Sequence, residues 1–374
     1  MDERVMKSCV GGPVPEWDLV HRLQIKEPVG PEIKDFGANF CTNSCFMDVI
    51  EPSLLEKQWP IMGVAIAFAG IAIGPYLYWL TNIRYPDPGG LLGDIFAALI
   101  SLSFGSIVWK LGRGLFFGLR YHPIRFHRET RKLYAIRERR FFAKPGEGDV
   151  VWEAPWTDES IFCLHREVTP FETVFHIRHY TVDDEGQVTR VFSIGREWTG
   201  ESQIRLALAQ WNYWCKYMND GPSELPKPML FHTQHETPRE SFLFSLYSFG
   251  MNAPVFMRLL AMPAVLIFTA MRMLANATCR APVWPEAIEK LSRIALDDPY
   301  AEPRAGTPVG WAQTILAQQR GEYPEDSNAR VDGWTGEPDG RTYAAAWLEN
   351  PEAATRTATH AMRVARERAR ATGS

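Results

Sequence analysis

The sequence lacks the motifs that identify several common enzyme classes. It has no Gly-x-Ser-x-Gly sequence, no Walker-type phosphate loop and no Gly-x-Gly-x-x-Gly sequence. These three motifs are typical of hydrolases, nucleotide hydrolases and dinucleotide-binding enzymes, respectively. His232 and His235 are three residues apart in a loop with nearby prolines, whereas a zinc-protease helix needs a spacing of four. His176 and His179 are three apart on an expected strand, so they face opposite sides of it. We therefore predict no catalytic residue, no metal and no cofactor, and favour a role other than catalysis.

Neither the spacing of the cysteines nor the net charge indicates a particular function. The six cysteines are scattered, and Cys41 and Cys45 have no second cysteine or histidine pair at zinc-ligand spacing. Reduced thiols in a cytosolic environment are the simplest interpretation. The net charge of -4 gives no electrostatic reason to expect nucleic acid as a partner. The first 58 residues contain no apolar core of the kind found in signal peptides, so we expect residues 1–58 to form a cytoplasmic N-terminal segment.

Charged residues are nearly absent from two long apolar stretches. Residues 61–80 carry no charge, and residues 90–109 carry only Asp94. At about 1.5 Å per residue, a helix of either length would cross a hydrocarbon core about 30 Å thick. The short connection between them is rich in proline and glycine, which favour a turn. We expect a transmembrane helical hairpin over residues 59–110. Asp94 would lie at the interface or, if buried in the membrane, mark a functional site.

A dense run of basic residues follows the second apolar stretch. It contains Lys110, Arg113, Arg120, Arg125, Arg128, Arg131, Lys132, Arg137, Arg139 and Arg140. Basic residues close to a membrane span are retained in the cytoplasm, so we expect a multi-pass protein with both termini cytoplasmic. The run either only fixes this topology or also binds anionic lipid, where each basic residue contributes about 1 kcal/mol. The candidate lipid-surface residues in this run are Arg113, Arg120, Arg125, Arg128, Arg131 and Lys132.

Residues 120–220 show short alternating runs that are typical of β-strands. About seven such runs precede one amphipathic helix, whose apolar residues recur every three or four positions. These apolar residues are Ile204, Leu208, Trp211, Cys215 and Met218. About seven antiparallel strands closed by one helix is the element order of a pleckstrin-homology-like β-barrel, although other small barrels share it. We expect an α+β membrane protein in which this barrel follows the hairpin in the cytoplasm.

A second apolar region occupies residues 240–300 and is interrupted by two arginines. Only 13 uncharged residues separate Arg258 from Arg272, which is too few to span a bilayer. Their spacing of 14 places them on nearly the same side of a helix. We expect a helix in the membrane interface with both arginines among lipid headgroups. A hydrophobic hairpin packed on the protein and a further span are the alternatives. Residues 323–374 have the composition of a largely disordered tail.

Several short motifs resemble one known family. They are FHRETRKLY at 126–134, VWE at 151–153, PVWP at 282–285 and DDPY at 297–300. With the expected hairpin, they resemble an uncharacterised family of proteobacterial two-span membrane proteins encoded near type VI secretion spike and effector genes. The resemblance covers roughly residues 15–320. It implies a bacterial inner-membrane location and a role as an accessory, adaptor or immunity-type factor.

Three functions follow from these features. The favoured one is a membrane-anchored interaction protein, whose partners are the lipid bilayer and another protein, a secretion effector or a secretion-machine component. The second is a lipid-binding module that uses the basic run and the arginine-bearing apolar helix. The third is a membrane-active effector that acts through its hydrophobic helices.

Overall fold

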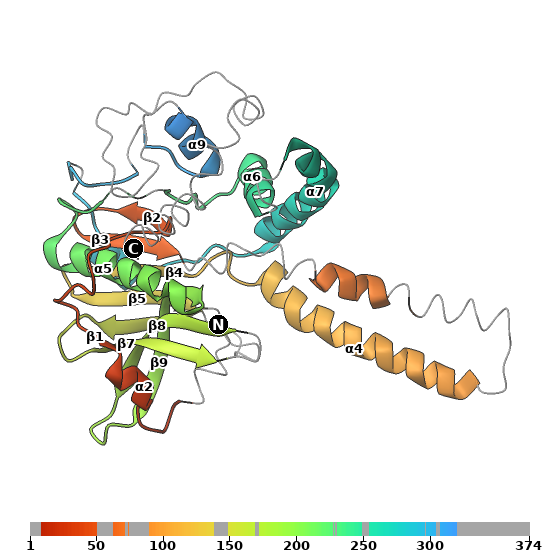
Figure 1. Ribbon diagram of the computed structural model, residues 1–374, viewed down its shortest axis with the longest axis horizontal. Coiled ribbons are helices and arrows are strands. Elements are labelled where there is room, and N and C mark those ends of the chain that lie inside the picture. The colour runs from red at the N-terminus through yellow and green to blue at the C-terminus, as the bar shows by residue number, and fades with distance from the viewer. Residues whose placement is uncertain are drawn as a thin grey trace, which may run out of the picture.

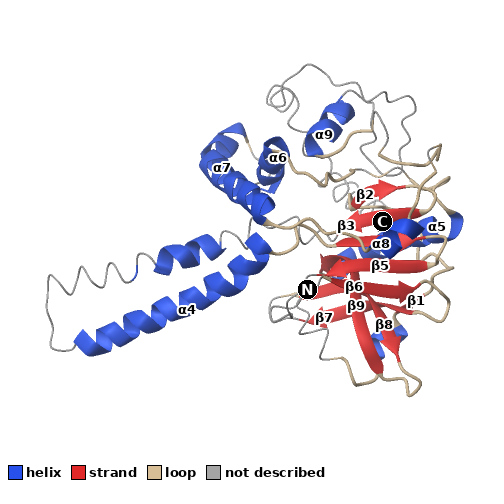
Figure 2. Ribbon diagram, turned by 180° about the vertical axis from the view of Figure 1, so that it is seen from behind, coloured by secondary structure: helices blue, strands red, loops and turns tan. Residues whose placement is uncertain are grey.

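The computed structural model shows an α+β protein with two antiparallel sheets, a helical arm and a group of helices beside the sheets (Figures 1 and 2). The structure describes residues 9–50, 63–71, 74, 90–137, 149–168, 172–226, 228, 230–248, 254–295, 297–303 and 307–319. The predicted tail at 323–374 lies outside these residues, as do Arg139, Arg140 and the side chain of Asp94.

Both sheets are built from consecutive antiparallel pairs, with strands added from the N-terminal part of the chain. The four-stranded sheet has the order β1 (Arg22–Leu23), β7 (Ile161–Val168), β8 (Thr173–Val182) and β9 (Val188–Thr199). The five-stranded sheet has the order β2 (Asn39–Thr42), β3 (Phe46–Ile50), β4 (Pro123–His127), β5 (Lys132–Arg137) and β6 (Val150–Pro155). β4 and β5 pair as an antiparallel hairpin, which confirms that the alternating runs in this part of the sequence are strands.

The main core lies between the sheets and helix α5 (Ile204–Asp220). Strand alternation sends Ile124 and Phe126 inward, where Phe126 packs 5.2 Å from Trp214 of α5, between ring centroids. The apolar stripe predicted for this helix is confirmed, because Trp211, Cys215 and Met218 are buried. A short 3₁₀ turn, η2 (Glu201–Gln203), leads from β9 into α5.

The predicted pleckstrin-homology-like barrel is wrong. The described strands form two separate sheets without closing into a barrel. In the described part of the chain, β6 pairs with β5 and β9 pairs with β8, and no ladder joins β6 to β9. At its first residue, Val188, β9 also exchanges backbone hydrogen bonds with Gly11 and Gly12. Side chains fill the seam between β6 and β9: Trp152 stacks on Phe192 with ring centroids 6.0 Å apart, and Arg190 lies 4.4 Å from the Trp152 ring. Aromatic packing therefore joins the sheets where a barrel would have a backbone ladder.

The predicted N-terminal two-helix transmembrane hairpin is also wrong. Among the described residues, the one helix long and apolar enough to cross a membrane is α7 (Val255–Thr278), from the second apolar region. The predicted second span belongs to α4 (Gly90–Phe117). The apolar part described there, Ile95–Trp109, extends only about 22 Å, against about 30 Å for a hydrocarbon core. Of the predicted first span, residues 63–71 are helical and most of the remainder lies outside the described residues.

The multi-pass topology and the orientation of the termini are likewise not supported by the described part of the chain.

α7 packs against α6 (Pro238–Ser248), and α6 packs against α9 (Trp311–Gln319). Leu246, Val265 and Ile315 form the contact among these three helices. The second apolar region is therefore a helical pair packed on the protein, with one face of α7 turned inward.

A strap, residues 280–295 and 297–303, crosses the outer face of the five-stranded sheet and contains α8 (Glu286–Leu291). Several contacts secure it, and two of them involve the residues of its motifs. The backbone N–H and the hydroxyl of Ser44 each donate a hydrogen bond of 2.8 Å to the carboxylate of Asp298. Trp284 stacks over Arg125 of β4 at 4.6 Å. The motifs at 282–285 and 297–300 therefore hold this strap in place.

Candidate binding pocket where the two long helices meet

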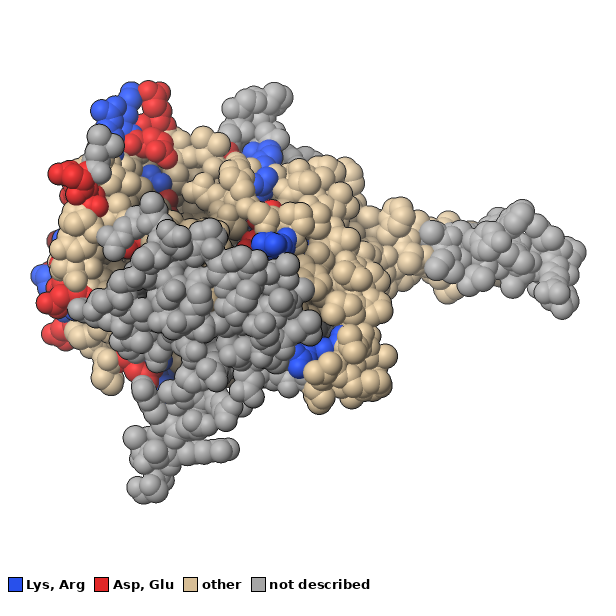
Figure 3. All heavy atoms as spheres, turned by 90° about the horizontal axis from the view of Figure 1, so that it is seen from above, with Lys and Arg blue, Asp and Glu red and all other residues tan. Residues whose placement is uncertain are grey.

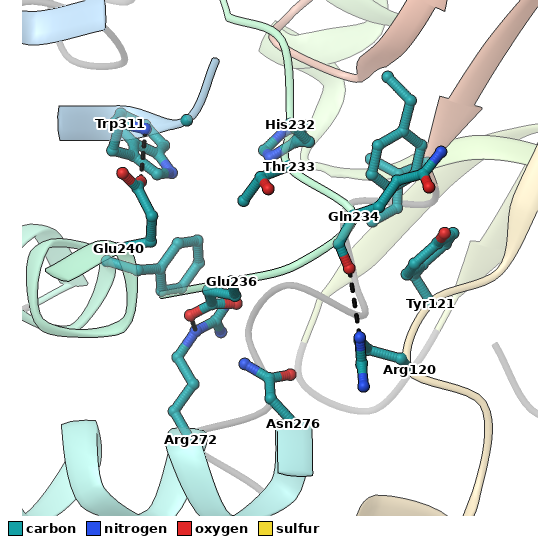
Figure 4. A pocket seen from close by; sticks show the side chains of 14 residues that line it. Arg120, Tyr121, His232, Thr233, Gln234, Glu236, Glu240, Arg272, Asn276 and Trp311 are labelled. Atoms are coloured by element: carbon teal, nitrogen blue, oxygen red, sulfur yellow. Dashed lines mark hydrogen bonds and ion pairs between the residues drawn. The ribbon is translucent and has the colours of Figure 1, made fainter. Parts of the chain in front are cut away.

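The C-terminal ends of α4 and α7 meet beside the five-stranded sheet (Figure 1). The backbone N–H of Arg120 donates to the carbonyl of Arg280 at 2.7 Å, and the N–H of Arg280 donates to the carbonyl of Gly118 at 3.0 Å. These bonds fix the two exit segments side by side. A cavity, which we call the base pocket, opens here between the exit segments, residues 232–240 and the first turn of α9 (Figure 4).

A neutralised ion pair lies in the middle of the base pocket. Arg272 of α7 is buried, and its Nη2 lies 2.9 Å from Oε2 of Glu236. The Ser241 hydroxyl donates a further bond of 2.7 Å to Glu236. The guanidinium of Arg272 also lies 3.9 Å from the ring centre of Phe244. Each charge is therefore compensated within the protein, as buried charges require.

Glu240 lies at the end of the pocket formed by α9. Its carboxylate accepts the backbone N–H groups of Trp311 at 2.6 Å and Ala312 at 3.2 Å, so it caps the first turn of that helix. A Cβ at Gly310, where φ is +83°, would lie 2.8 Å from this carboxylate, so glycine fits both the space and the backbone. Burial raises the pKa of Glu240 to about 7, although the two backbone hydrogen bonds act in the opposite direction.

The opposite end of the pocket is formed by Arg120, Tyr121 and Gln234 (Figure 4). Nη1 of Arg120 donates to the Gln234 carbonyl at 3.3 Å and lies 3.4 Å from Nδ1 of His235. Nε of Arg120 is buried with no hydrogen-bond acceptor, and no ion pair joins this arginine to a carboxylate among the described residues. Nδ2 of Asn276, from the last turn of α7, is also buried without an acceptor. This end therefore holds donors that the described protein does not satisfy.

Two ionisable groups in the base pocket stay neutral around pH 7. Burial lowers the pKa of His232 to about 4, so its imidazole is uncharged, and a ring nitrogen bonds the Gly37 carbonyl. Burial raises the pKa of Tyr121 to about 12, so its phenol keeps its proton. Tyr121 can therefore donate a hydrogen bond into the pocket.

A second cavity, the Trp284 cleft, adjoins the base pocket and shares Phe40, Tyr121 and Gln234 with it. Arg125 lies at its floor, where Nε and Nη2 each donate a 2.7 Å bond to the carboxylate of Asp48. Its guanidinium lies between the rings of Phe46, at 4.0 Å, and Trp284, at 4.6 Å. This bidentate, stacked arrangement is specific to arginine.

The eight residues predicted to face lipid have different surroundings. Arg125 and Arg272 are buried in ion pairs, while Arg128 donates to the Ser44 carbonyl and Arg131 to the carbonyl of Met218 at the end of α5. Lys132 is exposed and pairs with Glu153. Arg120 lines the base pocket. Arg113 and Arg258 belong to α4 and α7, and the side chain of Arg113 is not described. Contact of any of them with lipid stays a prediction.

A polar network that the sequence did not predict lies under the N-terminal helix α2 (Glu16–Val20). The buried Asp18 accepts hydrogen bonds from the Tyr180 hydroxyl and from Nδ1 of His165, the latter at 2.8 Å. Next to it, Nε of Arg178 donates to Nε2 of His176 at 2.7 Å. His179 instead packs against Phe162 on the core side, so the predicted opposite orientation of His176 and His179 is confirmed. The network joins α2 to β7 and β8.

No group of three or more metal-ligating side chains is placed to hold an ion within the described ranges. Neither a curated protein nor a solved structure matches the chain. A family model described as a family of unknown function (DUF6708) matches residues 101–296. The match begins inside α4 and ends in the strap. It therefore includes both helix ends that form the base pocket.

Proposed function

We propose that this chain, which belongs to DUF6708, a family of unknown function, is a membrane-attached interaction protein. In this proposal the apolar faces of α4 and α7 attach the protein to a bilayer. The two sheets, the strap and the adjoining cavities then face a protein partner at the membrane surface. The helix exits bring the attachment site and the cavities together.

The observation that carries the proposal is the apolar surface of the two helices. In α7 the buried side chains form one stripe that includes Val265, Phe268 and Arg272. On its other side Phe256 is 71% exposed and Leu260 is 67% exposed. The exposed large apolar residues of α4 are Leu92, Ile95, Phe96, Leu99, Leu102, Ile107, Trp109 and Phe117. Apolar patches of this kind mark membrane or protein contacts rather than surfaces that face water.

The charge distribution supports the same proposal. Figure 3 shows charged side chains scattered over the body of the molecule. Arg120 and Arg280 follow directly after the ends of α4 and α7. Basic residues next to an apolar helix favour the cytoplasmic surface of a membrane. A bacterial inner membrane is the location that we propose.

The Trp284 cleft supports a protein partner. It is lined by the partly exposed Tyr121 and Trp284 over the buried Arg125, next to the strap motif at 282–285. Aromatic and arginine residues dominate binding energy at protein interfaces. The sequence motifs at 126–134, 151–153 and 297–300 also lie on the five-stranded sheet and its strap. We propose a secretion effector or a component of the type VI secretion machine as the partner, with this protein acting as an adaptor or immunity-type factor.

Membrane flotation of the full chain tests the attachment. Leu259 and Leu266 are exposed on α7, and an aspartate at the centre of a membrane helix costs about 2.5–3.5 kcal/mol. We expect the wild-type protein to float with membranes and the double variant L259D/L266D to remain in the soluble fraction. Val168→Asp, at an exposed site on β7, is the matched control and should float like the wild type. A wild-type protein that does not float would contradict the proposal.

The same membranes test the partner. After chemical crosslinking in cells, the wild-type chain and Trp17→Ala should recover one and the same protein, and Trp284→Ala should lose it. Trp17 is a partly exposed tryptophan of α2, away from the cleft. Equal recovery by both tryptophan variants would count against the Trp284 cleft as the binding surface.

A further inference from the structure

We propose that the base pocket binds a phosphate group, which Arg120 and Asn276 hold from the two helix ends. A phospholipid headgroup supplies this phosphate when the protein is attached to a membrane. The phosphate site follows from the pocket alone, and only the lipid as its source rests on the proposed membrane attachment.

Arg120 provides the main argument. Its guanidinium lines the pocket and has no carboxylate partner among the described residues, and its Nε is buried with no acceptor. A buried donor without an acceptor is costly, and more so when it belongs to a charged group. A guanidinium presents its N–H groups in a fixed fork that fits two oxygens of a phosphate. A phosphate bound in the pocket would accept from the guanidinium of Arg120 and compensate its charge.

A second, independent donor reaches the pocket from the other helix. Nδ2 of Asn276 is buried without an acceptor, and the side chain extends from α7 towards the space between Glu236 and Arg120 (Figure 4). Tyr121 keeps its phenolic proton at neutral pH and lines the same end. Phosphate carries several strong acceptor oxygens, so one group can accept from the donors on both helix ends.

The carboxylates of the pocket do not oppose an anion at this end. Glu236 is already compensated by Arg272 and Ser241. Glu240 lies at the far end, and its oxygens accept the N–H groups of α9 (Figure 4). Arg120 is therefore the uncompensated charge at its end of the pocket, within the part of the chain that the structure describes.

The position of the pocket points to lipid as the source of the phosphate. Arg120 follows α4 by three residues, and Asn276 lies in the last turn of α7. If the apolar faces of these helices contact the hydrocarbon core, their ends lie at the level of the headgroups. A cationic side chain at this level attracts anionic lipid. The ligand class is therefore an anionic phospholipid.

Calorimetric titration of the full chain in a neutral sugar detergent tests the site without requiring membrane attachment. The probes are short-chain phosphatidylglycerol, inorganic phosphate and a short-chain diacylglycerol that lacks phosphate. We expect phosphatidylglycerol to bind and diacylglycerol not to bind. Arg120→Gln should weaken phosphatidylglycerol binding by about tenfold to a hundredfold, because it removes a charge-assisted contact. Arg120→Lys, which keeps the charge but loses the fork, should weaken it less.

Two further variants keep the result interpretable. Asn276→Asp places a negative charge in the pocket and should weaken binding without removing Arg120. Arg190→Gln, at an exposed arginine on β9, should bind like the wild type. Equal binding of inorganic phosphate and phosphatidylglycerol would overturn lipid as the source. Absence of binding by both, or unchanged binding by Arg120→Gln, would overturn the phosphate site, whether or not the protein floats with membranes.

Discussion

At the scale of single residues, the main feature is how each buried charge is compensated. Arg125 meets the carboxylates of Asp48 and Glu289 and two aromatic rings, and Arg272 meets the carboxylate of Glu236 and one ring. Glu240 instead has two backbone N–H groups and no cation in direct contact. Removing one partner of a buried ion pair is costly because it leaves the other charge unpaired. Glu240 can lose its charge by taking up a proton, which makes it sensitive to pH.

Glu240→Gln should remove part of the pH dependence of stability. The pKa of Glu240 in the folded protein, about 7, lies above its usual value of 4.5. Between these values the folded state binds more protons than the unfolded state, so the free energy of unfolding falls as pH rises from 4.5 to 7. The loss amounts to about 3 kcal/mol above pH 7. Glutamine keeps an acceptor for α9 but cannot ionise.

The measurement is the melting temperature of the full chain between pH 5 and pH 8. We expect the wild type to lose stability relative to Glu240→Gln across this range, since other titrating groups affect both proteins equally. Glu224→Gln, at an exposed carboxylate, should follow the wild-type curve. Parallel curves for wild type and Glu240→Gln would show that this carboxylate does not titrate there.

The sequence shows which residues are charged, but it does not show what surrounds each of them in the folded protein. The basic run made Arg125 a candidate for the membrane surface, yet it lies on a strand and pairs with Asp48, 77 residues earlier. Alternation correctly sends Ile124 and Phe126 to one face and Arg125 to the other. The sequence does not show that this other face is covered by a strap from residues beyond 280. The unpaired donors of Arg120 and Asn276 were missed for the same reason, because they meet only in the folded chain.

At the scale of elements, α5 shows how closely a helix is fitted to a sheet. It crosses β9 at Gly195, where φ is +77° and a Cβ would lie 2.4 Å from Cη2 of Trp214. Both the backbone conformation and the space therefore require glycine. Trp214 itself is fully buried, so its ring cannot move aside without disturbing the core.

Gly195→Ala should destabilise the protein by about 3 kcal/mol or more, since overpacking adds to the cost of a left-handed alanine. Gly200→Ala is the matched control. Gly200 has a similar φ of +82°, but nothing lies within 4 Å of its added Cβ. We expect that control to cost about 1–3 kcal/mol, because its φ of +82° and ψ of 153° fall in a region that essentially only glycine adopts. Gly195→Ala should cost more than the control, because the clash with Trp214 adds to the backbone cost. The comparison of urea unfolding midpoints checks both values, and equal losses would mean that α5 can shift away from β9.

The helices α5 and α7 show what the spacing of residues in the sequence predicts about a helix and what it does not. The stripe of α5 was predicted correctly, since Trp211, Cys215 and Met218 are buried in the core. Asn212, on another side of the helix, is also buried, because the segment 29–32 covers it. In α7 the two arginines do lie 14 residues apart on one helix, and Arg272 pairs with Glu236 and stacks on Phe244 of α6. Periodicity shows which residues share a face; it does not show what that face contacts.

At the scale of the whole molecule, the described strands form two sheets joined by side chains. The core of α5 and the aromatic contacts between Trp152 and Phe192 hold the sheets together. Element order along the chain resembles a closed barrel, but three strands come from the first 50 residues and none of the described ladders joins the sheets. The architecture therefore depends on pairings between distant segments, which local patterns do not reveal.

Hydrogen exchange should distinguish the two architectures. In open sheets, the amides of β6 and β9 that point away from their neighbours lack a ladder partner and should exchange faster than amides of the central strands β4 and β8. We expect this contrast in the full chain, measured by mass spectrometry with short labelling times. Equal protection of β6, β9, β4 and β8 would instead indicate a continuous ladder across the seam.

The two backbone hydrogen bonds between the helix exits couple the shape of the base pocket to the angle between α4 and α7. Arg120 follows α4 and Asn276 belongs to α7, and backbone hydrogen bonds from Arg280 to Gly118 and from Arg120 to Arg280 join the two helix exits. A change in the crossing angle of α4 and α7 would therefore pivot about this joint and alter the distance between the two donors. A group bound to both donors would favour one angle. By reciprocity, lateral forces on the helices would change the affinity of the pocket.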